Sequence, residues 1–256
     1  MQINQRGSTV FDSILFLIML LVVLACILPF VYMFALSFSD PAAIINGKVS
    51  LLPVGFSVAA YKQIFTYPNF FKAYGNTFFY TFFGTVISLC FTSMFAYPLS
   101  KKFLRGTGFV TKLVVFSMFF SGGLIPTYLL VSSLRLTGTV FAMLIPFAIN
   151  QFYLIILINF FKAFPYELEE AALIDGLGYF RIFIKIVLPL STPALATVGL
   201  YTAVFFWNDW FNGLIYLKSS QFPVMLFLRN IVNGTAVMGD GAGSADMSVI
   251  GISIKA

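Results

Sequence analysis

The chain has 256 residues, of which 60% are hydrophobic and only 9% are charged, and its net charge at pH 7 is +6. Soluble domains average about 45–50% apolar and about 25% charged residues, so this composition excludes an ordinary soluble enzyme and a disordered chain. The basic residues are spread too thinly to form a nucleic-acid-binding stripe. An integral membrane protein is therefore the expectation.

Five stretches without Asp, Glu, Lys or Arg are long enough to cross a membrane as helices, which takes about 20 apolar residues. They lie at residues 13–39, 73–100, 113–134, 136–161 and 186–208. The first exceeds the core of about 7–15 residues in a cleaved signal peptide, so we expect it to be retained, with a cleaved signal as the alternative. Residues 247–256 look like the start of a sixth helix that the sequence cuts short, or else an ordinary tail. These features predict an all-α fold with a single transmembrane domain over residues 1–256.

The expected orientation depends on the loop after the second stretch. Residues 101–112 contain no acid and four basic residues, namely Lys101, Lys102, Arg105 and Lys112. Positive residues concentrate in short cytoplasmic loops, so we expect this loop and the N-terminus to be cytoplasmic. Residues 40–72, the turn at Arg135 and residues 209–246 are then outside, and residues 162–185 are inside.

Three of the predicted helices contain groups that break or loosen a membrane helix. The third has Ser121-Gly122-Gly123 before Pro126, the fourth has Pro146 before Asn150-Gln151, and the fifth has Pro189 and Pro193. Broken helices often build the substrate sites of transporters, although Gly and Pro are also common in helices that only pack. For three helices together we favour a polar path. Its candidate residues are Ser121, Gly122, Gly123, Tyr128, Asn150, Gln151, Tyr153, Tyr201 and Asn208.

The expected cargo of this path is neutral or hydrogen-bonding, because no predicted span carries an internal charge. Aromatic rings beside amides suit the apolar faces and polar edges of sugars, but the same residue types also form interfacial belts. The chain has no histidine and no G-x-x-x-x-G-K-[ST] segment. We therefore expect no histidine-based catalytic or metal site and no P-loop for ATP in this chain, so that energy must come from elsewhere.

Residues 163–180 carry the clearest functional signal. Pro165 suits the first position of a short helix, and Glu167, Glu169 and Glu170 suit the positive end of its dipole. Gly176 or Gly178 can close this helix in a left-handed cap, and a second helix starts near Tyr179. Ala171-Ala172 leave a smooth patch for another protein. From the residues alone, a docking loop and a plain connector have equal weight.

The segment Glu170-Ala171-Ala172, Gly176 and Ile186-Val187-Leu188-Pro189 has the complete spacing of the E-A-A-x3-G-x9-I-x-L-P motif, and the chain thereby resembles the permease subunits of ABC importers. In that family this loop forms the coupling helix, which docks into a groove of the ATPase subunit. The resemblance implies that Glu170, Ala171, Ala172 and Gly176 make this contact. Asp175 belongs to the sugar-importer variant of the motif, E-A-A-x-x-D-G.

Further stretches are similar to the second permease of maltose-type carbohydrate importers, over about residues 12–256. They are Ala96-Tyr97-Pro98-Leu99-Ser100-Lys101, Phe160-Phe161-Lys162, Leu188-Pro189-Leu190-Ser191-Thr192-Pro193 and Trp207-Asn208-Asp209. Residues 119–128 resemble the branch that imports oligosaccharides cut from polysaccharides. The family has six helices, whereas this sequence stops at the start of the sixth.

The resemblance implies a type I importer bundle, multi-pass in the bacterial cytoplasmic membrane, that moves an oligosaccharide by alternating access. The implied partners are a second homologous permease in a heterodimer, two ATP-binding subunits that hold ATP and Mg, an extracytoplasmic solute-binding protein and membrane lipid, with no nucleic acid. The alternative function is a membrane scaffold that recruits a cytosolic protein through residues 163–180. A membrane enzyme ranks last, because the only acidic cluster is already explained by docking.

Overall fold

The computed structural model describes residues 9–101 and 103–233, and the regular secondary structure of these residues is entirely helical. The chain divides into two compact units, one of residues 1–70 with 231–256 and one of residues 71–230. The predicted start of a sixth helix at residues 247–256 lies outside the described residues.

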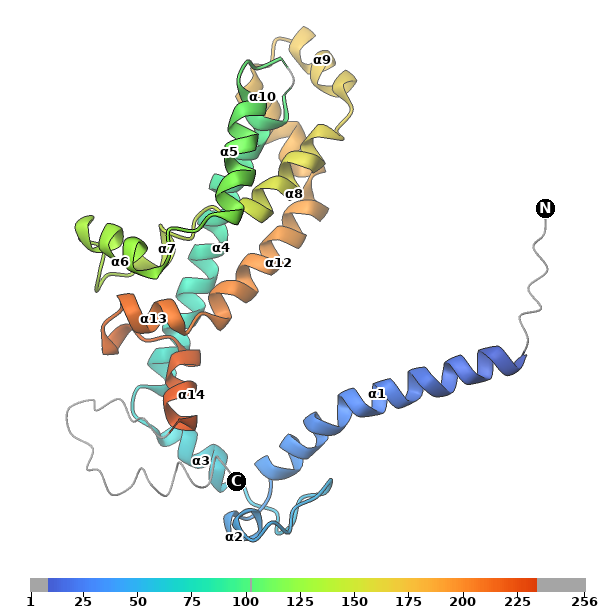
Figure 1. The fold of residues 1–256 in the computed structure, drawn as a ribbon, viewed down its shortest axis with the longest axis vertical. Coiled ribbons are helices and arrows are strands. Elements are labelled where there is room, and N and C mark those ends of the chain that lie inside the picture. The colour runs from blue at the N-terminus through green and yellow to red at the C-terminus, as the bar shows by residue number, and fades with distance from the viewer. Residues whose placement is uncertain (1–8, 102, 234–256) are drawn as a thin grey trace. The chain divides into compact units, whose positions relative to one another are not determined.

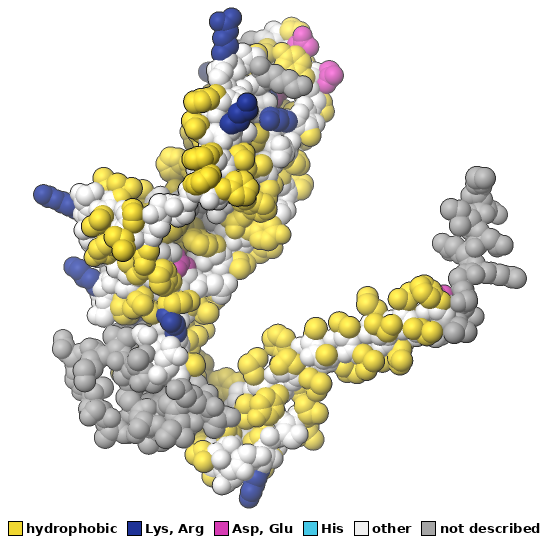
Figure 2. Space-filling view, in the orientation of Figure 1, with side chains coloured by type: hydrophobic (Ala, Val, Ile, Leu, Met, Phe, Trp, Pro, Cys, Tyr) yellow, Lys and Arg dark blue, Asp and Glu magenta, His cyan; other side chains and the backbone are white. Residues whose placement is uncertain are grey.

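The first unit contains α1 (Thr9–Ser37), α2 (Pro41–Ile45) and α3 (Ala59–Thr66). The segment Phe11–Ser37 has a mean hydropathy of 3.3 in its most apolar window, and none of that window is buried within the structure. Figure 2 shows hydrophobic side chains along the visible face of α1. A helix that is apolar on all sides requires an apolar environment such as a membrane. The structure therefore agrees with the first predicted span, which is long and apolar enough to cross a membrane.

Short polar contacts organise the segment that follows α1. Ser39 Oγ donates to the Ala35 carbonyl and accepts from the Val54 amide, at 2.6 and 3.1 Å. The Tyr61 hydroxyl donates to Ser37 Oγ at 3.0 Å. Asp40 caps α2 by accepting from the Ala42 amide at 3.2 Å. The predicted outer segment is therefore folded back on the end of α1 rather than extended.

The second unit holds the remaining helices, and Figure 1 shows α4, α5, α8 and α12 lying side by side within it. Their bounds in chain order are α4 (Phe70–Ser100), α5 (Thr107–Phe119), α6 (Leu124–Ser133), α7 (Phe141–Leu144), α8 (Gln151–Lys162), α9 (Tyr166–Ile174), α10 (Tyr179–Ile182), a π-helix η1 (Phe183–Val187), α11 (Leu188–Leu190), α12 (Thr192–Asn208), α13 (Phe211–Tyr216), a 3₁₀ turn η2 (Ser219–Gln221) and α14 (Val224–Val232).

Two of the predicted spans are bent. Over the predicted span 113–134, α5 and α6 meet at 116°, and over 186–208 the helix ending at Leu190 meets α12 at 79°. The first break falls at Ser121-Gly122-Gly123, with Gly123 at φ +86°, a backbone conformation that glycine adopts without strain. The predicted loosening of this helix is confirmed.

The span predicted over residues 136–161 is broken at Pro146 and Asn150, as the sequence predicts. The structure has α7 and then α8, which is only 12 residues long. Pro146 lies between them, where a proline lacks the amide hydrogen that would continue a helix. Asn150 then starts α8 afresh, because its Oδ1 accepts from the amides of Phe152 and Tyr153 at 2.9 and 3.3 Å. Among the described residues, two helices are long and apolar enough to cross a membrane, or four if each bent pair is one span.

Candidate functional site

The helix α9 corresponds to the predicted helix in residues 163–180, and Gly176 closes it in a left-handed cap as predicted. Gly176 has φ +79°, and its amide donates to the Leu173 carbonyl at 3.0 Å. The Leu177 amide donates to the Ala172 carbonyl at 3.0 Å, which completes a Schellman motif. Gly178 instead precedes α10, which begins at Tyr179. This cap fixes a sharp turn directly after α9.

The two sides of α9 differ in exposure. Glu169 and Ala172 are buried, with 2% and 5% of their surfaces exposed. The other predicted docking residues are all exposed, namely Glu170, Ala171, Asp175 and Gly176. Exposed apolar side chains lie among them, namely Tyr166, Leu168, Ile174, Tyr179 and Phe180. We call the exposed residues of 166–180 the coupling surface. Figure 2 shows acidic side chains at the end of the second unit where α9 lies.

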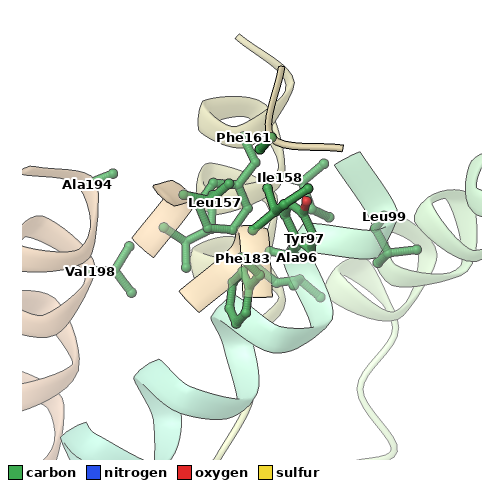
Figure 3. Close-up of a cluster of buried hydrophobic side chains, with 13 residues drawn as sticks. Ala96, Tyr97, Leu99, Leu157, Ile158, Phe161, Phe183, Ala194 and Val198 are labelled. Atoms are coloured by element: carbon green, nitrogen blue, oxygen red, sulfur yellow. The ribbon is translucent and has the colours of Figure 1, made fainter. Parts of the chain in front are cut away.

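The buried side of α9 rests on the largest core cluster among the described residues, which Figure 3 shows. Ala172 joins residues from α4, α8, α10, the π-helix and α12 in this cluster. The members with almost no exposed surface include Ala96, Leu157, Ile158, Ile182, Val187 and Val198. Close packing of this kind resists relative displacement, so the coupling surface is attached firmly to the helices beneath it.

A buried ion pair joins α9 to the end of α4, and the sequence did not reveal it. Lys101 Nζ pairs with Glu169 Oε1, and the two side chains are 10% and 2% exposed. Lys101 Nζ also lies 4.4 Å from the centre of the Tyr97 ring. The sequence predicts only that Lys101 lies in a basic cytoplasmic loop and Glu169 in the acidic first turn of a helix.

The candidate path residues form two aromatic pairs in the structure. Tyr153 on α8 and Tyr201 on α12 are stacked, with ring centroids 6.1 Å apart. Tyr128 on α6 stacks instead with Tyr216, also at 6.1 Å. The structure therefore brings together Tyr153 and Tyr201 but pairs Tyr128 with a residue that was not predicted.

The other candidate path residues have local structural roles. Ser121 Oγ accepts from the Gly123 amide at 3.2 Å inside the break that also contains Gly122, and Asn150 caps α8, which begins at Gln151. The Asn208 side chain donates to the Val204 carbonyl at 3.0 Å. These contacts leave the proposed role of these residues in a substrate path untested.

Buried hydroxyls on α4 are a further feature that sequence reasoning missed. Within the described residues, the Oγ1 atoms of Thr81, Thr85 and Thr92 are buried without a hydrogen-bond partner. Spacings of four and seven place these threonines on one side of the helix. An added Cβ at Gly199 of α12 would lie 3.9 Å from Thr85 Cγ2. The polar stripe therefore lies at the contact between α4 and α12.

Asp209 is a buried carboxylate directly after α12, and 8% of its surface is exposed. Its two oxygens accept from the Asn212 amide at 3.1 Å and from Asn212 Nδ2 at 2.8 Å. Burial raises the pKa of this carboxyl above its ordinary value, and the Asn212 hydrogen bonds partly oppose the rise.

Within the part of the chain that the structure describes, no three His, Cys, Asp or Glu side chains gather closely enough to hold a metal.

Asp209→Asn is expected to stabilise the second unit at pH 8, by an amount that shrinks as the pH falls. A raised pKa means that the folded state binds more protons than the unfolded state between the two pKa values, so folding stability falls as pH rises through this window. Thermal unfolding of the detergent-solubilised chain at several pH values measures the effect. Asp175→Asn, at an exposed position, is the control. A stability gain for Asp209→Asn that did not change with pH would contradict this assignment.

Comparisons with known proteins agree on one class. No family model matches the chain. It is similar to Protein LplC of Bacillus subtilis (strain 168), with 43% identity over 93% of this chain and 82% of that protein. It is also similar to the polygalacturonan/rhamnogalacturonan transport system permease protein YtcP of the same organism, with 42% identity over 95% of this chain and 84% of that one.

A solved structure resembles the chain over almost its whole length. It is the crystal structure of a bacterial ABC transporter involved in the import of the acidic polysaccharide alginate. The match has a TM-score of 0.85 and 32% sequence identity, and it covers 99% of this chain and 93% of that chain.

Proposed function

This chain belongs to the permease subunits of ABC sugar importers, and we propose that it moves an oligosaccharide into the cytoplasm by alternating access. Membership of this family makes it a multi-pass protein of the bacterial inner membrane. The observation that carries the proposal is the coupling surface, which is exposed to a partner on one side and packed on the other against the core of the membrane helices.

The proposed source of energy for transport is an ATPase that docks on residues 163–180. Glu170, Ala171, Asp175 and Gly176 are exposed for this contact. Ala172 is part of the core, so its contribution is to hold α9 in place. ATP and Mg would bind in that partner. When ATP closes the paired ATPases, movement of the coupling surface would favour the outward-facing bundle, because the two states bind the ATPase differently.

Permeases of this family work with a partner permease, an ATPase and a solute-binding protein. For this chain we infer a heterodimer of two homologous permeases, two ATP-binding subunits and an extracytoplasmic binding protein. Residues 40–72 and 209–246 are the candidates for contact with the binding protein. Lipid covers the apolar exposed faces, α1 above all.

We propose a cytoplasmic N-terminus from the basic loop at residues 101–112, and three contacts within the second unit agree with the resulting division of segments between the two sides of the membrane. The ion pair of Lys101 with Glu169 joins two segments that are both predicted to be inside. The Gly138 amide donates to the Tyr216 carbonyl at 2.7 Å, which joins two segments predicted to be outside. The Tyr80 hydroxyl donates to the Gln221 carbonyl at 2.9 Å, which brings the first turns of α4 to the same outer side.

The proposed substrate is an oligosaccharide cut from a polysaccharide. Relatives carry names that refer to polygalacturonan and rhamnogalacturonan or to arabinooligosaccharides, and the similar solved structure imports alginate. The stacked pair Tyr153 and Tyr201 on α8 and α12 offers flat rings of the kind that pack on sugar faces. The unpartnered threonine hydroxyls of α4 add hydrogen-bonding capacity between helices.

Reconstitution of the complex purified from its native membrane tests the proposal. Proteoliposomes would be assayed for ATP-dependent uptake of labelled oligogalacturonides, alginate oligosaccharides and arabinooligosaccharides. Glu170→Lys is expected to lower uptake by at least about tenfold, because loss of the coupling between two sites typically changes an equilibrium by about 5–150-fold. The partner permease should still co-purify. Arg135→Glu reverses an exposed charge in the predicted outer turn and is the matched control. A scaffold would retain its cytosolic partner but show no ATP-dependent uptake of any of these sugars.

A further inference from the structure

We propose that the buried ion pair of Lys101 and Glu169 links the coupling surface rigidly to α4, so that the two move together. This inference rests on the proposed function, in which α9 transmits movement of an ATPase. Lys101 and Glu169 are positioning residues in this account, because they act through the orientation of α9 and touch neither substrate nor nucleotide.

The burial of the pair is unusual for charged side chains at the end of a membrane helix. Lysine and glutamate are almost never fully buried unless they are paired. Here the carboxylate of Glu169 is enclosed, and its Oε2 atom has no hydrogen-bond partner among the described residues. A buried pair with an unsatisfied oxygen contributes little net stability, because the loss of hydration offsets the attraction between the charges. We therefore infer that the pair fixes the position of α9 relative to α4 rather than adding stability, because the two charges are satisfied only when Lys101 and Glu169 are in contact.

The aromatic site that holds Lys101 is built from α4 itself and two other elements. The Tyr97 ring lies under Lys101 Nζ, and it packs against Phe183 of the π-helix and Phe161 of α8 at centroid distances of 5.0 and 6.3 Å. These three rings belong to the core cluster on which Ala172 of α9 also rests. Attraction of an ammonium to an aromatic face is stronger where water is excluded. The ion pair thus fixes where α9 lies along the end of α4.

Contacts at the other end of α4 show which segment a rigid link between α9 and α4 would move. α4 has 31 residues, which at the rise of an α-helix is about 45 Å. Near its start, Asn76 Nδ2 donates to the Phe222 carbonyl at 3.2 Å, and Thr77 Oγ1 accepts from the Val224 amide at 2.8 Å. A single helix therefore connects the coupling surface with the segment before α14. Displacement of α9 would reach that segment only while α9 and α4 are joined.

Three variants separate the charge from the packing. Glu169→Gln removes the pair and leaves Lys101 buried alone. Lys101→Met with Glu169→Leu fills the site with apolar side chains of similar length, a replacement that is often neutral or stabilising for folding. Lys101→Glu with Glu169→Lys restores an ion pair in the opposite sense. Lys112→Gln removes an exposed charge outside the coupling surface and is the control.

The complete complex, with partner permease, ATPases and binding protein, is assayed in proteoliposomes for ATP hydrolysis with and without the substrate-loaded binding protein. Glu169→Gln and the Met/Leu pair are expected to lower the stimulation of hydrolysis by about tenfold or more, in the range of one coupling interaction, with unchanged basal hydrolysis and unchanged co-elution of the subunits. The reversed pair is expected to recover most of the stimulation.

Wild-type stimulation in the Met/Leu variant would overturn the proposal, and so would an assembled reversed pair without stimulation. If Glu169→Gln fails to assemble, the Met/Leu pair decides, because it leaves no unpaired buried charge. Failure of the proposed function has a different signature, since the wild-type complex would then show no stimulation and contain no ATPase.

Discussion

Gly176→Val is expected to abolish the stimulation of ATP hydrolysis by the substrate-loaded binding protein, whereas Gly176→Asn retains most of it. Gly176 has φ +79°, and no atom would lie within 4 Å of a Cβ added there, so the strain comes from the backbone conformation alone. The left-handed conformation costs about 1–2 kcal/mol for an ordinary residue, and the cost is largest for a β-branched one. Asparagine tolerates it. Valine would therefore open the Schellman cap and shift the end of α9.

The matched control is Gly178→Val, two residues further along the chain. Gly178 has φ −76° and ψ 157°, an extended conformation that suits valine, and it also has open space around it. ATP hydrolysis by the reconstituted complex is compared across the three variants, with gel filtration to show that the subunits stay together. Equal loss in Gly176→Val and Gly178→Val would mean that bulk, rather than the conformation of the cap, disturbs the coupling surface.

Gly84→Val is expected to destabilise the second unit by about 3 kcal/mol, the upper end of the usual cost of overpacking. A Cβ at Gly84 would lie 2.5 Å from Cε2 of Phe206, and Phe206 has no exposed surface into which its ring could move. The glycine lets α4 and α12 approach closely, as small residues do between membrane helices. Thermal unfolding of the purified chain in detergent micelles measures the loss.

Gly75→Val provides the comparison within the same helix, because nothing lies within 4 Å of a Cβ there. Its midpoint of unfolding should stay close to that of the unchanged chain. Phe206→Leu combined with Gly84→Val should recover part of the loss by making room for the added methyl groups. If Gly75→Val and Gly84→Val were equally destabilising, close approach of α4 and α12 could not be the cause.

Local signals in the sequence predicted the parts of the structure that local physics decides. The break at Ser121-Gly122-Gly123, the cap at Gly176 and the start of α10 at Tyr179 each depend on residues within one or two turns. The break within residues 136–161 was predictable for the same reason. Pro146 and the side-chain cap of Asn150 carried the local information that divides this stretch.

Pairings between distant segments were not predictable from the sequence. Lys101 and Glu169 are 68 residues apart, and nothing in their own neighbourhoods indicates that either is buried. The same holds for the contact of Gly84 with Phe206, since glycine is common in membrane helices for several reasons. The docking residues Glu170, Ala171, Asp175 and Gly176 came instead from a motif whose spacing identifies a family. Their exposure is consistent with that role, which stays a prediction.

Photo-crosslinking can show whether residues 163–180 contact an ATPase. A photoreactive amino acid would replace Ile174, which is 81% exposed on the coupling surface, and in a second chain Leu52, which is 77% exposed in the predicted outer segment. After irradiation of native membranes, the adducts are identified by mass spectrometry. We expect a P-loop ATPase crosslinked at position 174 and none crosslinked at position 52. An adduct at position 174 with no ATPase, or an ATPase joined equally at both positions, would contradict it.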